Sequence, residues 1–437
     1  MNISISDPKG ERNLVLSVLA AALLLRLGYA FLAQAVPPVT DMVLYDSARL
    51  AFLNNAPYTA DWPPLYPLFL AAVTRLFGEG YFILYAAQAV LSTLTCLLIY
   101  LASREAFDKR AGLAALLVSA AYIDSVWYSA VLMAETLGLL LLTGAVYLLL
   151  KREGRLLAGL VFGLACLTKG VYLITLPAVF AWEAARHGLK KGAVNSLKFG
   201  AVSLLLILPW TIRNYRAHKA FVLLEPHIGM SMFLGHNPSA TGGCDYYFSA
   251  YDYGKFFEDP ALTVTQKDKI ARDYAIKYIL ENPGRELQLF LLKLSKYWSF
   301  RTHFDMNNFP YPLRKWLFLG SLATNMLLFP ALVFGIAFSA GNRKALLFIF
   351  ITAAYTLAFT GPFSAFGRMR FPLVPFIIAL AAHGALLLPG LLARIKAGET
   401  AGIRGPLAAG AIASLLLFAN FAYQVLTRLG DVAGRFN

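Results

Sequence analysis

Apolar residues in this chain are grouped in long blocks, and polar residues collect in the segments between them. Blocks of about 20 mainly apolar residues match the thickness of a bilayer when they are helical, so we expect about eleven membrane spans. The expected spans are 14–36, 81–103, 111–131, 135–150, 156–169, 170–184, 197–213, 316–338, 345–361, 371–389 and 406–427. The two spans around Lys169 are short, and they either cross the membrane separately or form a re-entrant or bent pair. The first block exceeds the length of a secretion-signal core, so we interpret it as a retained helix.

Two long segments between the spans are predicted to contain helices of their own. In residues 37–80, Leu44, Ala48 and Phe52 recur at helical spacing, and Pro63-Pro64 are suited to begin a second helix. These helices either lie in the membrane interface or pack as parts of an ordinary loop. Residues 261–298 are also expected to be helical, with a break at Asn282-Pro283.

The basic residues predict how the chain crosses the membrane. Net charge is +15 and 58% of the residues are hydrophobic, which favours topology control and contact with anionic lipids over nucleic-acid binding. If the N-terminus is cytoplasmic, every short inner loop contains Lys or Arg. We therefore expect an integral protein of the bacterial inner membrane. It would contain an N-terminal module (1–213), an outer region (214–315) and a C-terminal module (316–437).

Carboxylates gather at the predicted outer ends of the spans. Asp41, Asp46 and Asp61 follow the first span, and Glu135 begins the fourth. Such groups can accept a proton from a hydroxyl or bind a divalent cation. They can equally act as helix caps or favourable charges at a helix N-terminus. Tyr45, beside Asp46, is a further candidate for substrate binding.

Cations at the same predicted ends are more informative, because outer-side Lys and Arg run against the positive-inside rule. The candidates are Lys169, Arg213, Arg368 and Arg370. Together they indicate an anion site, since Arg matches phosphate oxygens with a fork of donors and Lys with a point charge. The alternative for each is a side chain that extends to lipid headgroups.

Three polar residues of interest lie outside these groups. His236 and Asn237, in FLGHNPSATGG, either bind substrate or form a turn. Arg26 lies in the middle of the first span, where an unpaired charge is costly, so we expect a partner within the bundle.

The order of these features resembles the GT-C superfamily of membrane glycosyltransferases, in particular the branch of protein O-mannosyltransferases and aminoarabinose transferases. The resemblance depends on an acid after the first span, PPL in the interface helices, Glu at the fourth span, and the motifs TKG, PW-IRNY and FP-xx-P. It implies an all-helical fold and an inverting transfer of sugar from a polyprenyl-phosphate carrier on the outer face.

The resemblance also implies roles for individual residues. Asp41 matches the position of the catalytic base or acceptor-site carboxylate, and Glu135 matches the second acidic position, while Lys169, Arg213 and Arg368 or Arg370 would hold the carrier phosphate. Many relatives have two adjacent acids where this chain has Asp41-Met42. This leaves open whether Asp46 supplies the second carboxylate and whether a divalent cation, the one cofactor under consideration, is required.

The sequence therefore predicts a glycosyltransferase that uses a polyprenyl-phosphate-linked sugar and a glycan, glycolipid or protein acceptor, in contact with membrane lipids and without nucleic acid. A transporter or flippase for lipid-linked sugars is the alternative, and it should show broken midplane helices and inverted repeats. A structural or receptor-like protein, with incidental outer charges, is a third interpretation.

Overall fold

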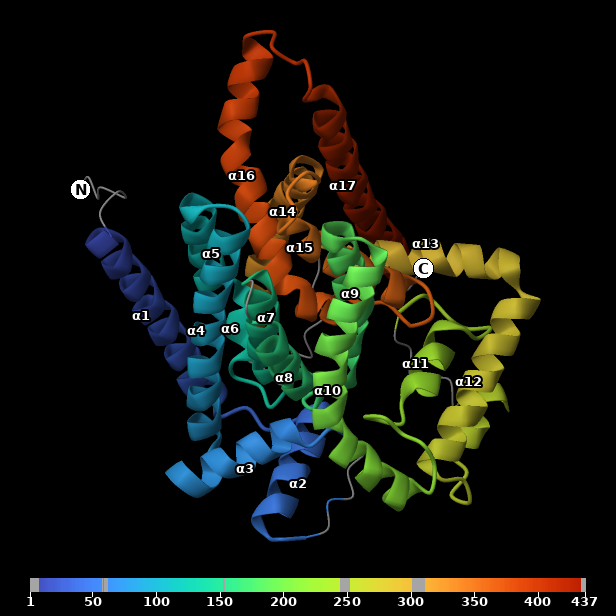
Figure 1. Ribbon diagram of the computed structural model, residues 1–437. Coiled ribbons are helices and arrows are strands. Elements are labelled where there is room, and N and C mark those ends of the chain that lie inside the picture. Colours follow the sequence, from blue (N-terminus) through green and yellow to red (C-terminus); the bar gives the residue numbers. More distant parts are fainter. Residues whose placement is uncertain are drawn as a thin grey trace.

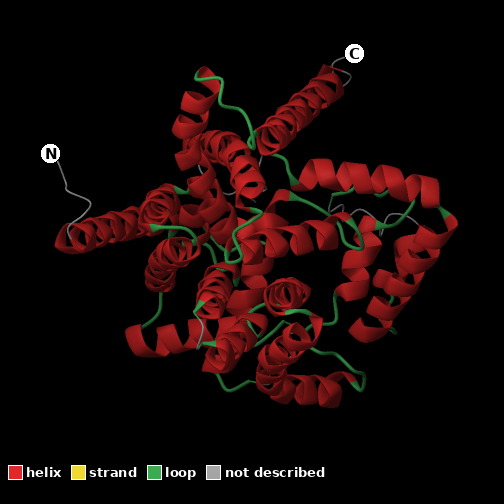
Figure 2. Ribbon diagram, turned by 45° about the horizontal axis from the view of Figure 1, so that its top comes forward, coloured by secondary structure: helices red, strands yellow, loops and turns green. Residues whose placement is uncertain are grey.

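The computed structural model describes residues 8–56, 58, 62–151, 154–243, 252–300 and 311–433. These residues form helices joined by turns and loops, and no strand occurs among them (Figures 1 and 2). The first half contains α1 (Pro8–Ala33), α2 (Asp41–Leu53), α3 (Leu65–Phe77), α4 (Tyr81–Ala106), α5 (Lys109–Ala121), α6 (Ile123–Tyr128), α7 (Glu135–Leu150), α8 (Arg155–Cys166), the 3₁₀ helix η1 (Gly170–Ile174), α9 (Thr175–His187) and α10 (Leu189–His218). The second half contains α11 (Ile228–Gly235), η3 (Asp252–Phe257), α12 (Val264–Glu281), α13 (Pro283–Tyr297), α14 (Tyr311–Ser339), α15 (Ala345–Thr360), η4 (Gly367–Leu373), α16 (Val374–Lys396) and α17 (Arg404–Ala433).

Several helices are suited to a membrane. Within the described part of the chain, six helical stretches are long and apolar enough to cross one, in α1, α4, α10, α14, η4–α16 and α17. Four shorter apolar helices, α3, α7, α8 and α15, accompany them. The expected all-helical membrane fold is confirmed, whereas the expected number of eleven spans is not.

The block 111–131 is not the single helix that its apolar run predicts. α5 ends at Ala121, Tyr122 is extended, and the short α6 follows. Arg26 of α1 lies at this break: its guanidinium donates to the carbonyls of Ser119 and Ala120 at 3.1 and 2.9 Å, and to Ser92 Oγ at 2.8 Å. A cation suits the negative end of a helix dipole and its unpaired carbonyls. The partners of Arg26 are therefore mostly backbone groups, at the end of α5.

The two predicted helices of the first long segment are present as α2 and α3. The buried face of α2 differs from the one expected, because Met42, Tyr45, Ala48 and Arg49 are buried while Leu44 is 49% exposed. Arg49 is buried through its bonds to Asp46 Oδ1 (2.8 Å) and Thr74 Oγ1 (3.2 Å). The predicted break in residues 261–298 is also present, at Asn282 between α12 and α13.

The loops that were assigned to one side of the membrane meet at one end of the bundle. Ion pairs join Glu11 to Arg104 and Lys109, Glu105 to Lys151 and Lys344, and Glu183 to Arg155. Helices α1, α7, α9 and α15 each have one end at these ion pairs. Their other ends lead, respectively, to α2, Glu135, the Lys169 turn and η4. The predicted site residues Asp41, Glu135, Lys169 and Arg368 consequently belong to the opposite end of the bundle, where α2 and α3 lie (Figure 1).

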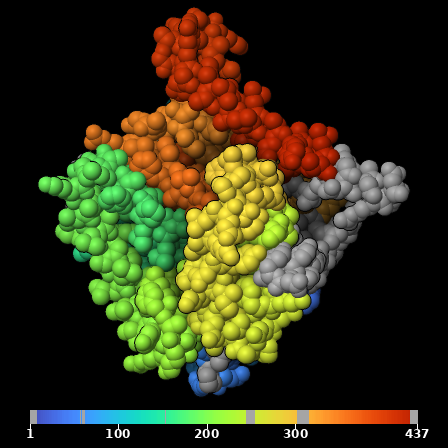
Figure 3. Space-filling model, turned by 90° about the vertical axis from the view of Figure 1, so that its right-hand side faces the viewer, coloured from blue at the N-terminus to red at the C-terminus, as the bar shows by residue number. Residues whose placement is uncertain are grey.

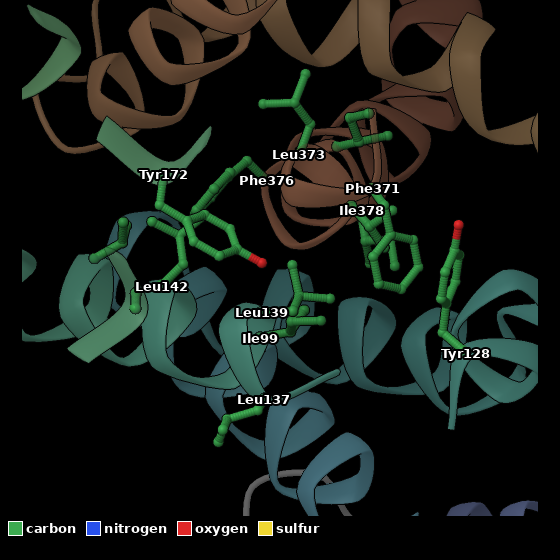
Figure 4. Packing of buried hydrophobic residues seen from close by; sticks show 14 of the residues in the cluster. Ile99, Tyr128, Leu137, Leu139, Leu142, Tyr172, Phe371, Leu373, Phe376 and Ile378 are labelled. Atoms are coloured by element: carbon green, nitrogen blue, oxygen red, sulfur yellow. The ribbon is translucent and has the colours of Figure 1, made fainter. Parts of the chain in front are cut away.

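The turn η4 is held by a packed core beneath it. Phe371 of η4 contacts Tyr128 of α6, with ring centroids 4.0 Å apart, and Leu373 and Phe376 continue this apolar layer against α7 (Figure 4). α16 packs closely on α14, where a side chain on Gly384 would clash with Ala331 O and Gly335 N. Small residues allow such close helix contacts within membranes. On one flank, α12 and α13 form a broad surface (Figure 3).

Candidate active site

Four charged side chains from separate parts of the chain form one connected cluster, which we call the charged cluster: Asp41, Glu135, Lys169 and Arg368. Glu135 Oε1 accepts hydrogen bonds from Lys169 Nζ at 2.8 Å and from Arg368 Nε at 2.9 Å. Arg368 Nη2 also donates to Asp41 Oδ2 at 2.9 Å. Arg368 thus bridges the two carboxylates that the sequence placed at the outer helix ends.

Each member of the charged cluster is fixed by a helix terminus or a tight turn. Asp41 is the first residue of α2, after a sharp reversal at Thr40, where φ is 49°. Glu135 is the first residue of α7, where the helix dipole favours a negative charge. Lys169 lies between α8 and η1, and Arg368 lies in η4. The ends of helices and the turns between them therefore determine where the four side chains of the cluster lie.

The charged cluster is deep at Glu135 and open at Asp41. The side chains of Glu135, Lys169, Arg368 and Asp41 are 3%, 17%, 21% and 32% exposed, respectively. Their formal charges sum to zero. Arg368 Nη1 and Asp41 Oδ1 make no hydrogen bond to any residue that the structure describes, and Lys169 Nζ makes one. The cluster thus has donors and an acceptor left for a ligand.

Aromatic side chains form the wall next to Asp41. The Tyr45 ring contacts Tyr66 and Trp62, with centroids 5.0 and 5.7 Å away, and Trp62 in turn contacts the His227 ring at 5.3 Å. Tyr45 is only 1% exposed, so it supports the site from beneath. Burial raises the pKa of Tyr45, and the nearby Glu135 and Glu225 raise it further.

Glu225 is a site residue that the sequence reasoning missed. It follows α10 in VLLEPH, and its Oε1 accepts a hydrogen bond from the backbone N–H of Gly170 at 3.2 Å, next to Lys169. Burial raises the pKa of Glu225, while His227 and Lys169 partly offset this rise. The sequence gives only a weak signal, an acid about a dozen residues beyond the end of the seventh expected span (197–213).

Arg213, at the end of α10, lies beside this aromatic wall and outside the charged cluster. Its guanidinium stacks on the rings of Trp210 and Tyr58, 4.6 and 5.5 Å from their centroids, and donates to Tyr58 O and to Asn214 Oδ1. Trp210 Nε1 donates to Leu224 O, which connects this wall to the segment that contains Glu225. Arg213 therefore flanks the site.

Arg370 points away from the charged cluster, although it is only two residues from Arg368. It is buried and donates to the carbonyls of Tyr297 and Ser299, at the end of α13. His236 and Asn237 are also buried, at 3% exposure, and contact groups outside the charged cluster: His236 contacts Glu286, Lys293 and Gly361 O, and Asn237 donates to Phe233 O.

The remaining acids are not part of the charged cluster. Asp46 pairs with Arg49 and accepts a hydrogen bond from Tyr81 at 3.1 Å, which fixes α2 to the start of α4. Asp61 lies outside the described residues. Among the residues with described positions, no group of three or more His, Cys, Asp or Glu is arranged to hold a metal ion.

Comparisons with known proteins agree with this fold. A family model described as dolichyl-phosphate-mannose-protein mannosyltransferase matches residues 61–212. Archaeal oligosaccharyltransferase AglB from Archaeoglobus fulgidus, in complex with an inhibitory peptide and a dolichol-phosphate, superposes with a TM-score of 0.54 and 16% identity over 93% of this chain and 55% of AglB. The apo form of the Archaeoglobus fulgidus oligosaccharyltransferase gives a TM-score of 0.54 and 17% identity, over 93% of this chain and 56% of that one.

ArnT from Cupriavidus metallidurans bound to undecaprenyl phosphate gives a TM-score of 0.42 and 15% identity, over 86% of this chain and 78% of ArnT. No curated protein matches the sequence. At these identities the structural likeness concerns the fold, and this chain spans about 55% of the length of AglB.

Proposed function

We propose that this chain, which has the fold of the GT-C membrane glycosyltransferases, transfers a sugar from a polyprenyl-phosphate carrier to an acceptor hydroxyl. The observation that carries the proposal is the convergence of Asp41, Glu135, Lys169 and Arg368 at one end of a membrane bundle. The matching family model, named for a dolichyl-phosphate-mannose-dependent enzyme, supports a donor of this class.

The cations suit the leaving group. When the bond between the sugar C1 and the phosphate oxygen breaks, negative charge develops on the phosphate, and donors already in place stabilise it. Lys169 Nζ and Arg368 Nη1 have the free hydrogen-bonding capacity for this task. Glu135 holds both cations from the buried side, so we assign it the role of their counter-ion and support.

Asp41 suits the general base. It is the most exposed carboxylate of the charged cluster, and its Oδ1 is available to an incoming hydroxyl. As the acceptor oxygen bonds to C1 and the phosphate leaves, the hydroxyl proton passes to Asp41, and the configuration at C1 inverts. Because Arg368 now contacts Asp41, we expect donor phosphate to draw the guanidinium towards itself and so release the base.

The test uses purified protein in detergent, where a transporter has no second compartment. A labelled polyprenyl-phosphate sugar and a panel of glycan, glycolipid and peptide acceptors are supplied, and the glycosylated product is measured. We expect transfer by the wild type and by Lys277→Met, a matched control on α12 with an exposed lysine. Asp41→Asn should bind undecaprenyl phosphate but transfer the sugar about a hundredfold more slowly or worse. Binding without any transfer, in every acceptor arm, would favour a flippase.

A further inference from the structure

The turn that contains Arg368 is in contact with residues of the segment 214–315, which we call the outer segment. Residues 361–366 lead from the end of α15 into η4. On the inner side, Phe371 and Leu373 anchor η4 in the core (Figure 4). On the other side the turn contacts Gly235 at the end of α11, Gly242 and α13. The position of Arg368 therefore depends on elements that contain no member of the charged cluster.

A polar triad holds the beginning of this turn: Lys293 and His236, which are buried, and Glu286, whose side chain is 16% exposed. Lys293 Nζ, on α13, donates to Gly361 O at 2.9 Å and lies 2.8 Å from His236 Nε2. His236 Nδ1 lies 2.7 Å from Glu286 Oε2. With His236 neutral and its proton on Nδ1, Lys293 donates to Gly361 O and to His236 Nε2, and His236 donates to Glu286. His236 Nε2 then lies 3.1 Å from Gly361 O without donating to it. Lys293 is only 1% exposed.

The rest of the turn is held by the same segment. The Ala365 N–H donates to Gly242 O at 3.0 Å. Gly235, at the end of α11, lies so close that an added Cβ would be 2.9 Å from the Phe363 carbonyl carbon. Arg370 then binds the Tyr297 and Ser299 carbonyls at the end of α13. Contacts thus occur on both sides of Arg368, at Gly361, Ala365 and Arg370.

A buried lysine is an energetically unfavourable way to fix a loop, because desolvation of an ammonium group costs free energy, whereas burial of an apolar side chain is favourable. Its three donors have a use that an apolar residue lacks, since they bind Gly361 O and His236 at once. We therefore interpret Lys293 as a residue that fixes the position of the turn accurately, and not as one that is present to stabilise the fold.

We propose that Lys293, together with His236 and Glu286, is a positioning group that sets the place of Arg368 in the charged cluster. This inference rests on the proposed function, because it assigns Arg368 to the carrier phosphate. Through this triad the outer segment determines how well the site receives its donor. Lys293 touches neither the cluster nor the reacting atoms, so its substitution acts through the turn alone.

Hydrogen exchange tests the proposal independently of catalysis. The variant is Lys293→Met, which keeps the length of the side chain, and Lys277→Met on the exposed face of α12 is the matched control. We expect exchange in peptides covering residues 361–371, including the Ala365 amide, to accelerate by about tenfold in Lys293→Met while α7 and α8 keep their protection. Unchanged exchange there would overturn the proposal, even if the wild type shows no transferase activity.

The affinity for undecaprenyl phosphate tests the functional part of the proposal. The Kd for undecaprenyl phosphate should rise about tenfold or more in Lys293→Met, the loss expected when one charge-assisted hydrogen bond is weakened. The KM for the acceptor should stay unchanged, and Lys293→Arg should recover part of the affinity. If Lys293→Met does not fold, Glu286→Gln, at the more exposed end of the triad, should change both readouts in the same direction. Wild-type values in that variant would also overturn the proposal.

Discussion

Glu135→Gln tests whether this residue is the counter-ion of the two cations. The substitution keeps the size of the side chain and removes one negative charge. The charged cluster then changes from a net charge of zero to +1, because Lys169 and Arg368 keep their charges while Asp41 alone opposes them. The variant should therefore lose stability when empty and gain affinity for an anion.

The stability loss follows from the two bonds at Glu135 Oε1. Lys169 and Arg368 donate to this one oxygen at 2.8 and 2.9 Å, and Glu135 is 3% exposed. Removal of one partner from a buried ion pair costs about 3–5 kcal/mol. The Gln carbonyl still accepts a hydrogen bond, though a weaker one than a carboxylate accepts. We expect a loss near the lower end, about 3 kcal/mol.

The affinity gain follows from removed repulsion. A phosphate bound to the same two cations would lie roughly 5 Å from the Glu135 carboxylate, which at an effective dielectric constant of about 20 corresponds to repulsion of about 3 kcal/mol. The partial exposure of Lys169 and Arg368, 17% and 21%, reduces this figure by screening. We therefore expect the Kd for undecaprenyl phosphate to fall by about tenfold.

Thermal unfolding in detergent, at one scan rate because such unfolding is often irreversible, measures both effects. Empty Glu135→Gln should melt below the wild type, and undecaprenyl phosphate should raise its melting temperature by more than it raises that of the wild type. Glu183→Gln is the matched control, since Glu183 is a buried, ion-paired acid at the opposite end of the bundle. The control should lose stability without any change in Kd. Weaker phosphate binding in Glu135→Gln would refute the charge-balance reasoning.

Three further predictions follow from single residues. Asp41→Asn should lower kcat by a factor of about a hundred or more, as for loss of a general base, with no weakening of undecaprenyl phosphate binding in the same preparation. Arg26→Met should lower the melting temperature, because the carbonyls of Ser119 and Ala120 lose their buried donor, at a cost of about 1–3 kcal/mol. Burial lowers the pKa of Lys293 from 10.5 to about 8, with Glu286 opposing the change. The unfolded chain therefore holds this proton between pH 8 and 10.5 while the folded protein releases it, so stability should rise with pH in this window by up to about 3 kcal/mol. In Lys293→Met this part of the rise, followed by melting temperature against pH, should disappear.

The sequence predicts the charged cluster well because membrane topology converts chain order into position. Asp41 and Arg368 are 327 residues apart, and Glu135 and Lys169 lie between them in the sequence. Each of the four nevertheless follows or precedes an apolar block at the same end. Successive apolar blocks cross the membrane in alternating directions, and the basic loops at the other end indicate which ends lie together. This is enough to predict that the four residues lie on one face. Hydrophobic patterning and proline positions likewise locate α2, α3 and the break at Asn282.

The sequence cannot separate Arg368 from Arg370, because the choice depends on tertiary contacts. Both lie in the turn η4, and only the position of α13 decides that Arg370 meets the Tyr297 and Ser299 carbonyls. Glu225 was missed for a similar reason, since its burial comes from packing against the Lys169 turn in a segment without periodicity. The break at Tyr122 has no glycine or proline to signal it, and the carbonyls that it leaves at the end of α5 are bound by the distant Arg26.

A neutral resting cluster is an advantage for a site at a membrane surface. Unpaired cations there would attract the abundant anionic lipid headgroups. In this protein Glu135 and Asp41 neutralise Lys169 and Arg368, so a headgroup gains little by approaching. A carrier whose prenyl chain and sugar make additional contacts can offset the cost of separating Arg368 from Asp41, and the same step frees the base. We therefore expect selectivity for the donor and activation of Asp41 to arise from a single exchange of ion-pair partners.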